Sequence, residues 1–142
     1  MGLHLTVEHR SEIEKHGVET YPHECCGFLI GSLNGENSTV DETVRAVNTR
    51  TDRPSNRFEI DPLELMKTDR AARAKGKTVV GFYHSHPDAP ARPSEYDRER
   101  AWPGYCYLIV SVRSGIAVDF LNWRLLEDRS AFEADPVRID AT

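Results

Sequence analysis

The chain has 142 residues, of which 39% are hydrophobic and 29% are charged, and its formal net charge is -5. This length and composition exclude a disordered chain and predict a single globular domain over residues 1–142. The acidic balance disfavours nucleic acid as a partner. No apolar run reaches the roughly 20 residues that cross a bilayer, and the N-terminus lacks the layout of a secretory signal, so we expect a cytoplasmic protein without membrane contact.

The three cysteines are Cys25, Cys26 and Cys106. Their number is odd and two of them are adjacent, so a disulfide framework is not expected. Thiolates can bind zinc, but the chain has no C-x-x-C pair, and a free cysteine is more often a small buried hydrophobic residue. A structural metal site built on Cys25 or Cys26 is therefore a minor alternative.

The N-terminal residues predict a strand followed by a helix. Residues 3–7 alternate between apolar and polar side chains, as a half-buried strand does. Residues 8–19 are expected to form the helix, with Thr6 as its N-cap and with Gly17 and Pro22 marking its end region.

The next segment predicts a buried hairpin and then a loop. Residues 25–30 form a compact apolar run that we interpret as a buried strand, with Glu24 at its entry and Gly31 at its stop. Residues 38–47 alternate between apolar and polar side chains, so we expect a second strand that pairs with the first as a hairpin. Residues 48–57 contain no large apolar side chain and are rich in turn formers, so they predict a binding loop.

A second helix is predicted from Asp61, the N-cap, with Pro62 at its first position. Glu64 completes a capping-box pattern, and Gly76 is expected to close the helix. The residues expected on its inner face are Leu63, Met66, Ala71 and Ala74.

The rest of the sequence, from residue 77 on, predicts three strands, a short helix and a last short strand. Residues 77–84, 105–112 and 116–122 are β-branched, aromatic or otherwise apolar runs, and residues 94–101 follow a proline-rich turn as a short helix. Residues 137–139 could add a short strand near the C-terminus. Strands that alternate with helices and hairpins favour an α/β fold in which helices flank a mixed sheet.

A metal-site pattern lies at the end of the strand over residues 77–84. His84 and His86 are two residues apart, so their imidazoles project from the same face of a strand. Asp97 lies eleven residues after His86, and the turn between them is long enough to bring its carboxylate back to the two imidazoles. Two imidazoles and one carboxylate are a common ligand set for catalytic zinc, which leaves a position for water, and a separate carboxylate must then move the proton. Glu24 is the best candidate for this base.

Each of these residues also has an ordinary structural interpretation. A histidine on a strand is most often a half-exposed surface residue, and a single glutamate before a strand is most often solvated. Ser94 and Asp97 form an S-x-x-D pattern after a proline, which is itself a helix start. Capping and metal binding are compatible, because a helix start would hold Asp97 on a rigid first turn.

The pattern resembles a known family. His84 and His86, seven residues, Ser94, two residues and Asp97 match the H-x-H-x7-S-x2-D signature of the JAMM (MPN+) zinc metallopeptidases without substitution. The upstream run YPHECCGFLIG, which contains Glu24, is similar to that family's first motif. The resemblance implies a cytidine-deaminase-like MPN fold, zinc held by the two histidines and Asp97, Glu24 as general acid and base, and Ser94 as the residue that stabilises the oxyanion.

The resemblance also implies an activity. Members hydrolyse peptide or isopeptide bonds after the Gly-Gly tail of ubiquitin or a ubiquitin-like protein, and short single-domain members resemble the prokaryotic group that acts on sulfur-carrier proteins. The tail would lie extended beside the site by strand addition. A homodimer would not be unusual for this fold. The identity of the carrier and of the leaving group, which could be cysteine, a short peptide or a lysine side chain, stays open.

Three alternatives accompany this hypothesis. A deubiquitinase-like isopeptidase is less favoured, because the chain lacks a long insertion for gripping ubiquitin chains. A non-catalytic module of the same fold usually lacks a ligand, and none is missing here. Base deamination is disfavoured, because the H-x-E and P-C-x-x-C motifs of the deaminases do not occur.

Overall fold

The computed structural model describes residues 2–49 and 59–141. Within these residues, eight strands form one sheet in the order β7-β6-β5-β4-β2-β3-β1-β8. In chain order the elements are β1 (Gly2–Thr6), α1 (Val7–Thr20), β2 (Cys26–Asn34), β3 (Asn37–Ala46), α2 (Pro62–Ala74), β4 (Thr78–Pro87), α3 (Glu95–Arg100), β5 (Cys106–Arg113), β6 (Ile116–Leu125), β7 (Phe132–Asp135) and β8 (Val137–Asp140).

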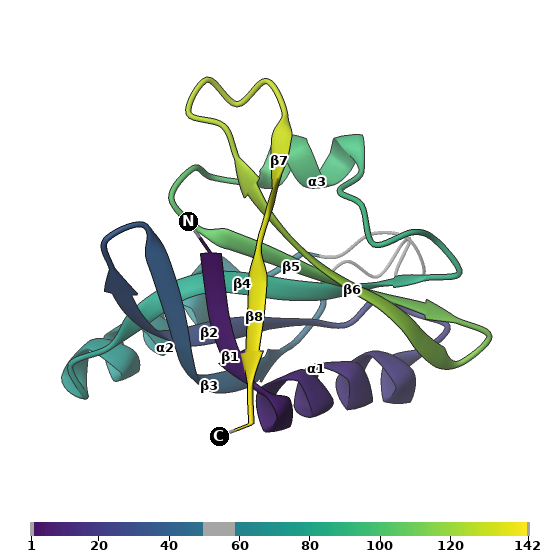
Figure 1. Cartoon of the computed structure of the whole chain (residues 1–142), viewed down its shortest axis with the longest axis horizontal. Coiled ribbons are helices and arrows are strands. Elements are labelled where there is room, and N and C mark those ends of the chain that lie inside the picture. Colours follow the sequence, from purple (N-terminus) through teal and green to yellow (C-terminus); the bar gives the residue numbers. More distant parts are fainter. Residues whose placement is uncertain (1, 50–58, 142) are drawn as a thin grey trace.

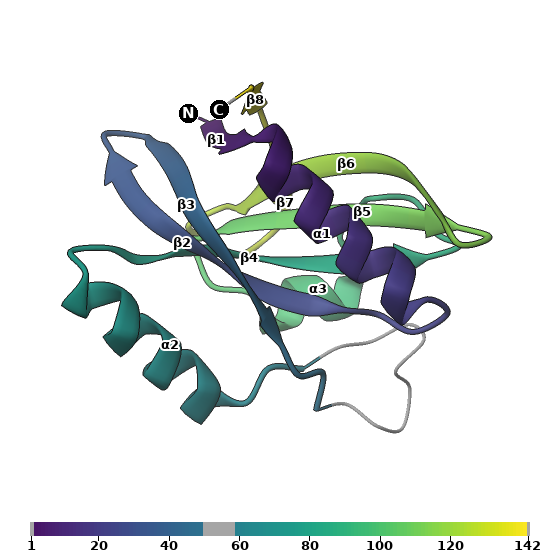
Figure 2. The same ribbon diagram turned by 90° about the horizontal axis from the view of Figure 1, so that it is seen from below.

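The sheet is mixed and lies between helices, which confirms the predicted α/β fold. β4 and β5 run parallel, whereas β2 pairs antiparallel with both β3 and β4. Helix α1 covers one face of the sheet, and α2 and α3 lie on the other (Figure 1, Figure 2). Each face therefore has its own apolar core, one around Tyr83 and Leu108 beneath α1 and one around Phe28 and Phe82 beneath α2.

Helix α1 begins as predicted at Thr6. The Thr6 hydroxyl accepts a hydrogen bond from the His9 backbone N–H at 3.2 Å, and the His9 ring accepts one from the Thr6 N–H at 3.2 Å. Gly17 lies inside the helix rather than at its end. A Cβ at this position would lie 3.2 Å from Val112 Cγ2, so glycine lets the helix approach β5 closely.

The predicted inner face of α2 is wrong. Its buried side carries Leu65 and Ala72, which pack with the core beneath the helix. Asp69 lies on the same side and accepts a hydrogen bond from the Val79 N–H at 3.2 Å, which fixes the rotation of the helix against β4. The four residues expected to face inward are exposed: Leu63, Met66, Ala71 and Ala74.

The predicted start of α2 is only half right. Asp61 is the N-cap, because its carboxylate accepts from the Leu63 N–H at 2.9 Å, and Pro62 is the first helical residue. Glu64 does not complete a capping box. Its carboxylate accepts instead from the Val47 N–H at 3.4 Å, which connects the helix to the end of β3.

Strands β2 and β7 also differ from prediction. Strand β2 continues through Gly31, where its pairing with β3 shifts register. A Cβ at residue 31 would lie 1.7 Å from the Thr39 carbonyl oxygen, so this glycine permits a close backbone approach and does not stop the strand. Strand β7 was not predicted, because it is a short polar strand that pairs with β6 alone within the described residues.

Gly31→Ala is expected to lower the free energy of unfolding by about 3 kcal/mol, because the methyl group meets a backbone carbonyl that cannot rotate away. Urea denaturation measures this change. Leu33→Ala on the same strand is the control, since Leu33 is 60% exposed and its truncation should change stability little. Equal stability of Gly31→Ala and the wild type would contradict the close approach.

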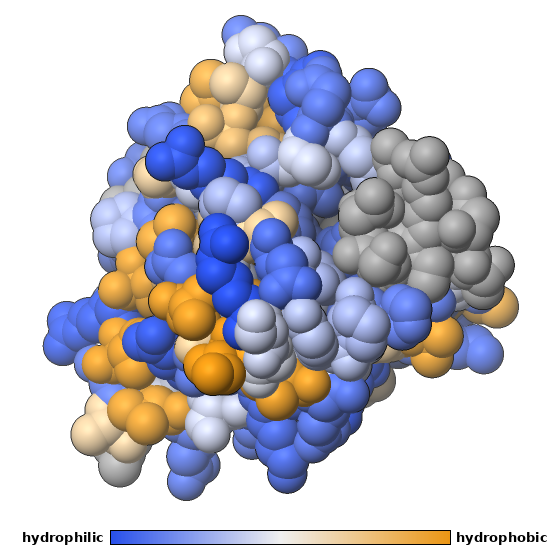
Figure 3. Space-filling view, turned by 90° about the vertical axis from the view of Figure 1, so that its right-hand side faces the viewer, coloured by the Kyte–Doolittle hydropathy of each residue, from blue (hydrophilic) through white to orange (hydrophobic). Residues whose placement is uncertain are grey.

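No helix in the described part of the chain is long and apolar enough to cross a membrane. On the face drawn in Figure 3, hydrophobic residues form small groups separated by hydrophilic ones. The predicted loop over residues 48–57 falls largely outside the described residues, of which only Asn48 and Thr49 belong to it.

Candidate functional site

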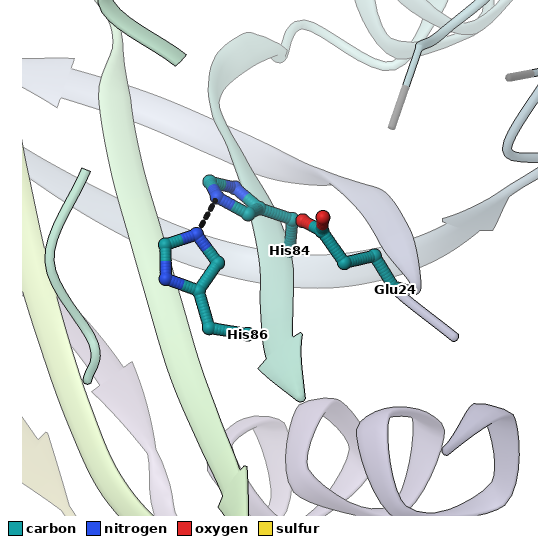
Figure 4. A group of neighbouring side chains, drawn as sticks. All are labelled: Glu24, His84 and His86. Carbon is teal, nitrogen blue, oxygen red and sulfur yellow. Dashed lines mark hydrogen bonds between the residues drawn. The ribbon is translucent and has the colours of Figure 1, made fainter. Parts of the chain in front are cut away.

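The two histidines of the HSH sequence lie on β4 and face the α3 side of the sheet. His84 is 1% exposed and His86 is 8% exposed. Their Nε2 atoms are 3.1 Å apart, and Figure 4 shows the two rings turned toward one another. The strand alternation predicted from the i, i+2 spacing therefore brings both imidazoles to one point.

Asp97 reaches the same point from the first turn of α3. Its Oδ2 lies 3.3 Å from His84 Nε2 and 3.2 Å from His86 Nε2. The predicted capping box holds it there, because Asp97 Oδ2 accepts from the Ser94 N–H at 2.8 Å and the Ser94 hydroxyl accepts from the Asp97 N–H at 3.1 Å. Ser94 and Asp97 therefore form the helix start that the sequence predicts, and the same two bonds hold the Asp97 carboxylate beside the histidines.

The charges of this cluster suit a cation. Burial would raise the pKa of Asp97, but the two facing imidazoles and the Ser94 N–H outweigh it and hold that pKa well below its usual range. Burial lowers the pKa of His84. Burial alone would also lower the pKa of His86, but the Asp97 carboxylate raises it. The ionised Asp97 and the neutral His84 are in the states that bind metal, whereas a metal at His86 would have to displace the proton that Asp97 favours there.

Glu24 lies just before β2 and is only 3% exposed. One of its carboxylate oxygens and a ring nitrogen of each histidine all lie within 4.8 Å of one another. Figure 4 shows its side chain extending toward His84. Folding therefore brings this glutamate, sixty positions upstream of His84, to the histidines.

Backbone contacts hold Glu24 in this place. The Asn48 side-chain amide donates to the Glu24 carbonyl at 3.2 Å and accepts from the Glu59 N–H at 3.0 Å. On the other side, the Cys25 N–H donates to the hydroxyl of Ser85 at 2.8 Å, and the Ser85 N–H donates to the Cys25 carbonyl at 3.2 Å. Ser85 thus connects the segment that carries Glu24 to the residue between the two histidines.

The turn after β4 is fixed by three side chains. His86 Nδ1 lies 2.8 Å from the Pro90 carbonyl oxygen, so the ring presents Nε2 to the cluster. The neighbouring carbonyls accept hydrogen bonds from β5 and β6: Ser111 donates to Ala89 at 2.5 Å, and the Trp123 indole donates to Ala91 at 2.9 Å. A rigid turn therefore orients His86.

Two cavities border the cluster. The smaller has a volume of about 250 Å³ and is lined by Glu24, His86 and Ser94, together with Arg92 and other residues of the turn. The larger has a volume of about 480 Å³ and an apolar wall that is largely aromatic, including Phe82, Tyr96, Trp102 and Tyr107. His84 and Asp97 line the larger cavity, so the cluster lies between the two.

The geometry of the donor atoms fits a zinc ion. Tetrahedral zinc with ligand bonds of about 2.0 to 2.1 Å places its ligand atoms about 3.3 Å apart. The three distances among His84 Nε2, His86 Nε2 and Asp97 Oδ2 are 3.1, 3.3 and 3.2 Å. By contrast, the three cysteines are buried, and burial raises the pKa of Cys25 to about 11, which disfavours the thiolate that a metal needs.

The structure brings together the five residues expected from the sequence, Glu24, His84, His86, Ser94 and Asp97, and their roles stay predictions. Apart from the Ser94–Asp97 capping pair, the contacts that orient them were not predicted. The Pro90 carbonyl and the Trp123 indole have no sequence signal, because their roles depend on the path of the turn. Ser85 could have been found, since a residue between two histidines on a strand must face the opposite side of the sheet.

Comparisons with known proteins show the family of this chain. Residues 6–126 match the family model described as prokaryotic homologs of the JAB domain. The chain belongs to this JAB family. The JAB chain is 40% identical over 114 residues to a desampylase of Haloferax volcanii, a match that covers 77% of this chain and 80% of the relative.

Two further matches extend this result. The JAB chain is 40% identical over 92 residues to a probable TtuB-protein conjugate cleaving protease of Thermus thermophilus, with 64% of this chain and 58% of that protein covered. A JAB1/MPN domain protein of Archaeoglobus fulgidus has the same fold, with a TM-score of 0.59 at 19% identity over 97% of this chain and 96% of that one. The JAB chain is thus a hydrolytic enzyme of the JAMM type with an MPN fold.

Proposed function

We propose that this enzyme is a zinc-dependent peptidase that cleaves a peptide or isopeptide bond after the C-terminal Gly-Gly tail of a ubiquitin-like protein. The observation that carries the proposal is the meeting of three ligand atoms within 3.3 Å of one another beside the buried carboxylate of Glu24. The desampylase and the conjugate cleaving protease support the substrate class, since both names describe the removal of a ubiquitin-like modifier or the cleavage of its conjugates.

His84, His86 and Asp97 would hold the zinc, and its chemistry there is to act as a Lewis acid and to lower the pKa of a water to about 7. Glu24 takes a proton from the attacking water and gives it to the leaving amine as the C–N bond breaks. The burial of Glu24 keeps bulk water away from this transfer.

Ser94 has a second role beside its capping bond. Its hydroxyl oxygen accepts from the Asp97 N–H, which leaves the hydroxyl proton available to donate. Ser94 lines the same small cavity as Glu24, so this proton can stabilise the oxygen of the substrate carbonyl as negative charge develops on it.

The alternatives from the sequence are weaker here. A non-catalytic module would have no need for a buried Glu24 beside a complete ligand set. An isopeptidase specific for ubiquitin chains would use the same chemistry, so only a comparison of substrates distinguishes the two functions. We also propose that the chain acts as one domain in the cytoplasm, on a sulfur-carrier type of ubiquitin-like protein.

The proposed function predicts that zinc-loaded enzyme cuts a ubiquitin-like protein immediately after Gly-Gly when that tail carries an extension. Mass spectrometry of the product checks the cleavage position. A matched substrate with Ala-Ala in place of Gly-Gly should stay intact. Cleavage elsewhere in the tail, or equal cleavage of both substrates, would contradict the proposal.

Ser85→Ala is expected to lower kcat about tenfold while zinc content stays unchanged. The substitution leaves the buried Cys25 N–H without its side-chain acceptor and loosens the backbone next to Glu24. Steady-state kinetics and metal analysis measure the two effects. Ser38→Ala is the control, because Ser38 is also buried but contacts Cys106 instead of the segment that carries Glu24. An equal loss of kcat in both variants would argue against a positioning role.

A further inference from the structure

Arg92 is the unexplained residue of the smaller cavity. It lies in the turn between β4 and α3 and lines the cavity with Glu24 and Ser94. Its side chain is exposed, and within residues 2–49 and 59–141 its guanidinium makes no ion pair or hydrogen bond. Among the described residues of this wall, it is the only one with a permanent positive charge.

The main chain beside Arg92 is held firmly. The carbonyls of the three residues before it lie against Ser111, His86 and the Trp123 indole. Arg92 therefore extends from a fixed point next to the site. A flexible cationic side chain on a fixed base suits the recognition of a small anion that arrives with the substrate.

The position of Glu24 shows which part of the substrate this anion would belong to. Under the proposed function, Glu24 delivers a proton to the leaving amine, so the leaving group lies in the cavity that Glu24 lines. Arg92 lines the same cavity, whereas the larger apolar cavity lies on the side of His84 and Asp97. Arg92 is thus placed on the side of the leaving group.

The candidate leaving groups differ in charge near the reacting nitrogen. A single amino acid carries its α-carboxylate two bonds from the amine, and a guanidinium pairs well with a carboxylate. The side-chain amine of a lysine within a protein has no carboxylate nearby, because its own carboxyl carbon is in a peptide bond. A cation at this position therefore discriminates between the two.

We propose that Arg92 binds the α-carboxylate of the leaving group, so that the enzyme prefers a Gly-Gly tail extended by one amino acid over an isopeptide to lysine. This inference rests on the proposed function and names the leaving group. Water adds to the glycine carbonyl carbon, the C–N bond breaks, and the products are the Gly-Gly carboxylate and a free amino acid. Glu24 carries the proton from the water to the amine.

The first test compares kcat/KM for three substrates of one ubiquitin-like protein: its Gly-Gly tail extended by alanine as the free acid, extended by alanine amide, and joined to the lysine side chain of a blocked lysine. The free acid is expected to be cleaved about fivefold to tenfold better than the amide or the isopeptide, and Arg92→Gln should remove this preference. Added salt should weaken the preference in the wild type. Arg70→Gln is the control, since this substitution also removes one positive charge, but from the exposed surface of α2.

The second test separates binding from catalysis. The zinc-loaded Glu24→Gln variant is titrated with a fluorescent peptide ending in Gly-Gly-Ala, as the free acid or as the amide. The free acid should bind at least about threefold more tightly, and adding Arg92→Gln should make the two peptides equal. Equal binding of acid and amide, or no binding of either, would overturn the role of Arg92. Failure of the wild type to cleave any of the three protein substrates would instead refute the proposed function.

Discussion

Glu24→Gln is expected to lower kcat by about 10²-fold to 10⁴-fold while the protein still binds one zinc ion. Glutamine has nearly the shape of glutamate but cannot accept the proton of the attacking water. The donor atoms of His84, His86 and Asp97 are unchanged in this variant, so metal binding should persist. Kinetics and metal analysis of the same preparation measure both effects.

Glu36→Gln is the matched control, because Glu36 is exposed in the turn between β2 and β3 and lines neither cavity. It should keep wild-type kinetics. Zinc loss in Glu24→Gln would make Glu24 a metal ligand and remove it from proton transfer. Wild-type activity would show that another group carries the proton.

Asp97→Asn is expected to lower the affinity for zinc more than about 100-fold and to abolish hydrolysis at limiting zinc. The amide oxygen can still accept from the Ser94 N–H, so α3 should keep its start. The variant therefore removes the negative charge and leaves the helix in place. Competition with a chromophoric chelator measures the affinity.

Asp128→Asn serves as the control for Asp97→Asn, because Asp128 is exposed and, among the described residues, its carboxylate accepts only from Ser130 in its own turn. Its zinc affinity should equal that of the wild type. Zinc affinity that is unchanged in Asp97→Asn would show that Asp97 is a capping residue alone, which is the ordinary interpretation of the S-x-x-D pattern.

The site could be predicted from the sequence where local geometry decides the positions. The spacing of His84 and His86 fixes their common face on a strand, and the pattern of Ser94 and Asp97 fixes a helix start. Glu24 was a weaker inference, since sixty residues separate it from His84; it was the best candidate for the base by residue type, and the family resemblance then supported it. Its place at the cluster follows from the pairing of β2 with β4.

The failures have a common physical cause. The inner face of α2 was predicted from helical spacing, but Asp69 accepts a hydrogen bond from the Val79 N–H at the start of β4, and Leu63 and Met66 lie exposed. Gly31 was interpreted as a strand end, although it marks a place where two backbones approach closely. In these places tertiary contacts override local preference, and one sequence contains no direct signal for them.

Anomalous diffraction at the zinc edge, from crystals of wild-type enzyme loaded with zinc, tests the central claim most directly. The predicted result is a single peak about 2.0 to 2.2 Å from His84 Nε2, His86 Nε2 and an Asp97 carboxylate oxygen. The Glu24 carboxylate should lie outside the bonding distance of that peak. A peak at the cysteines, or a metal bound directly by Glu24 without Asp97, would contradict the account.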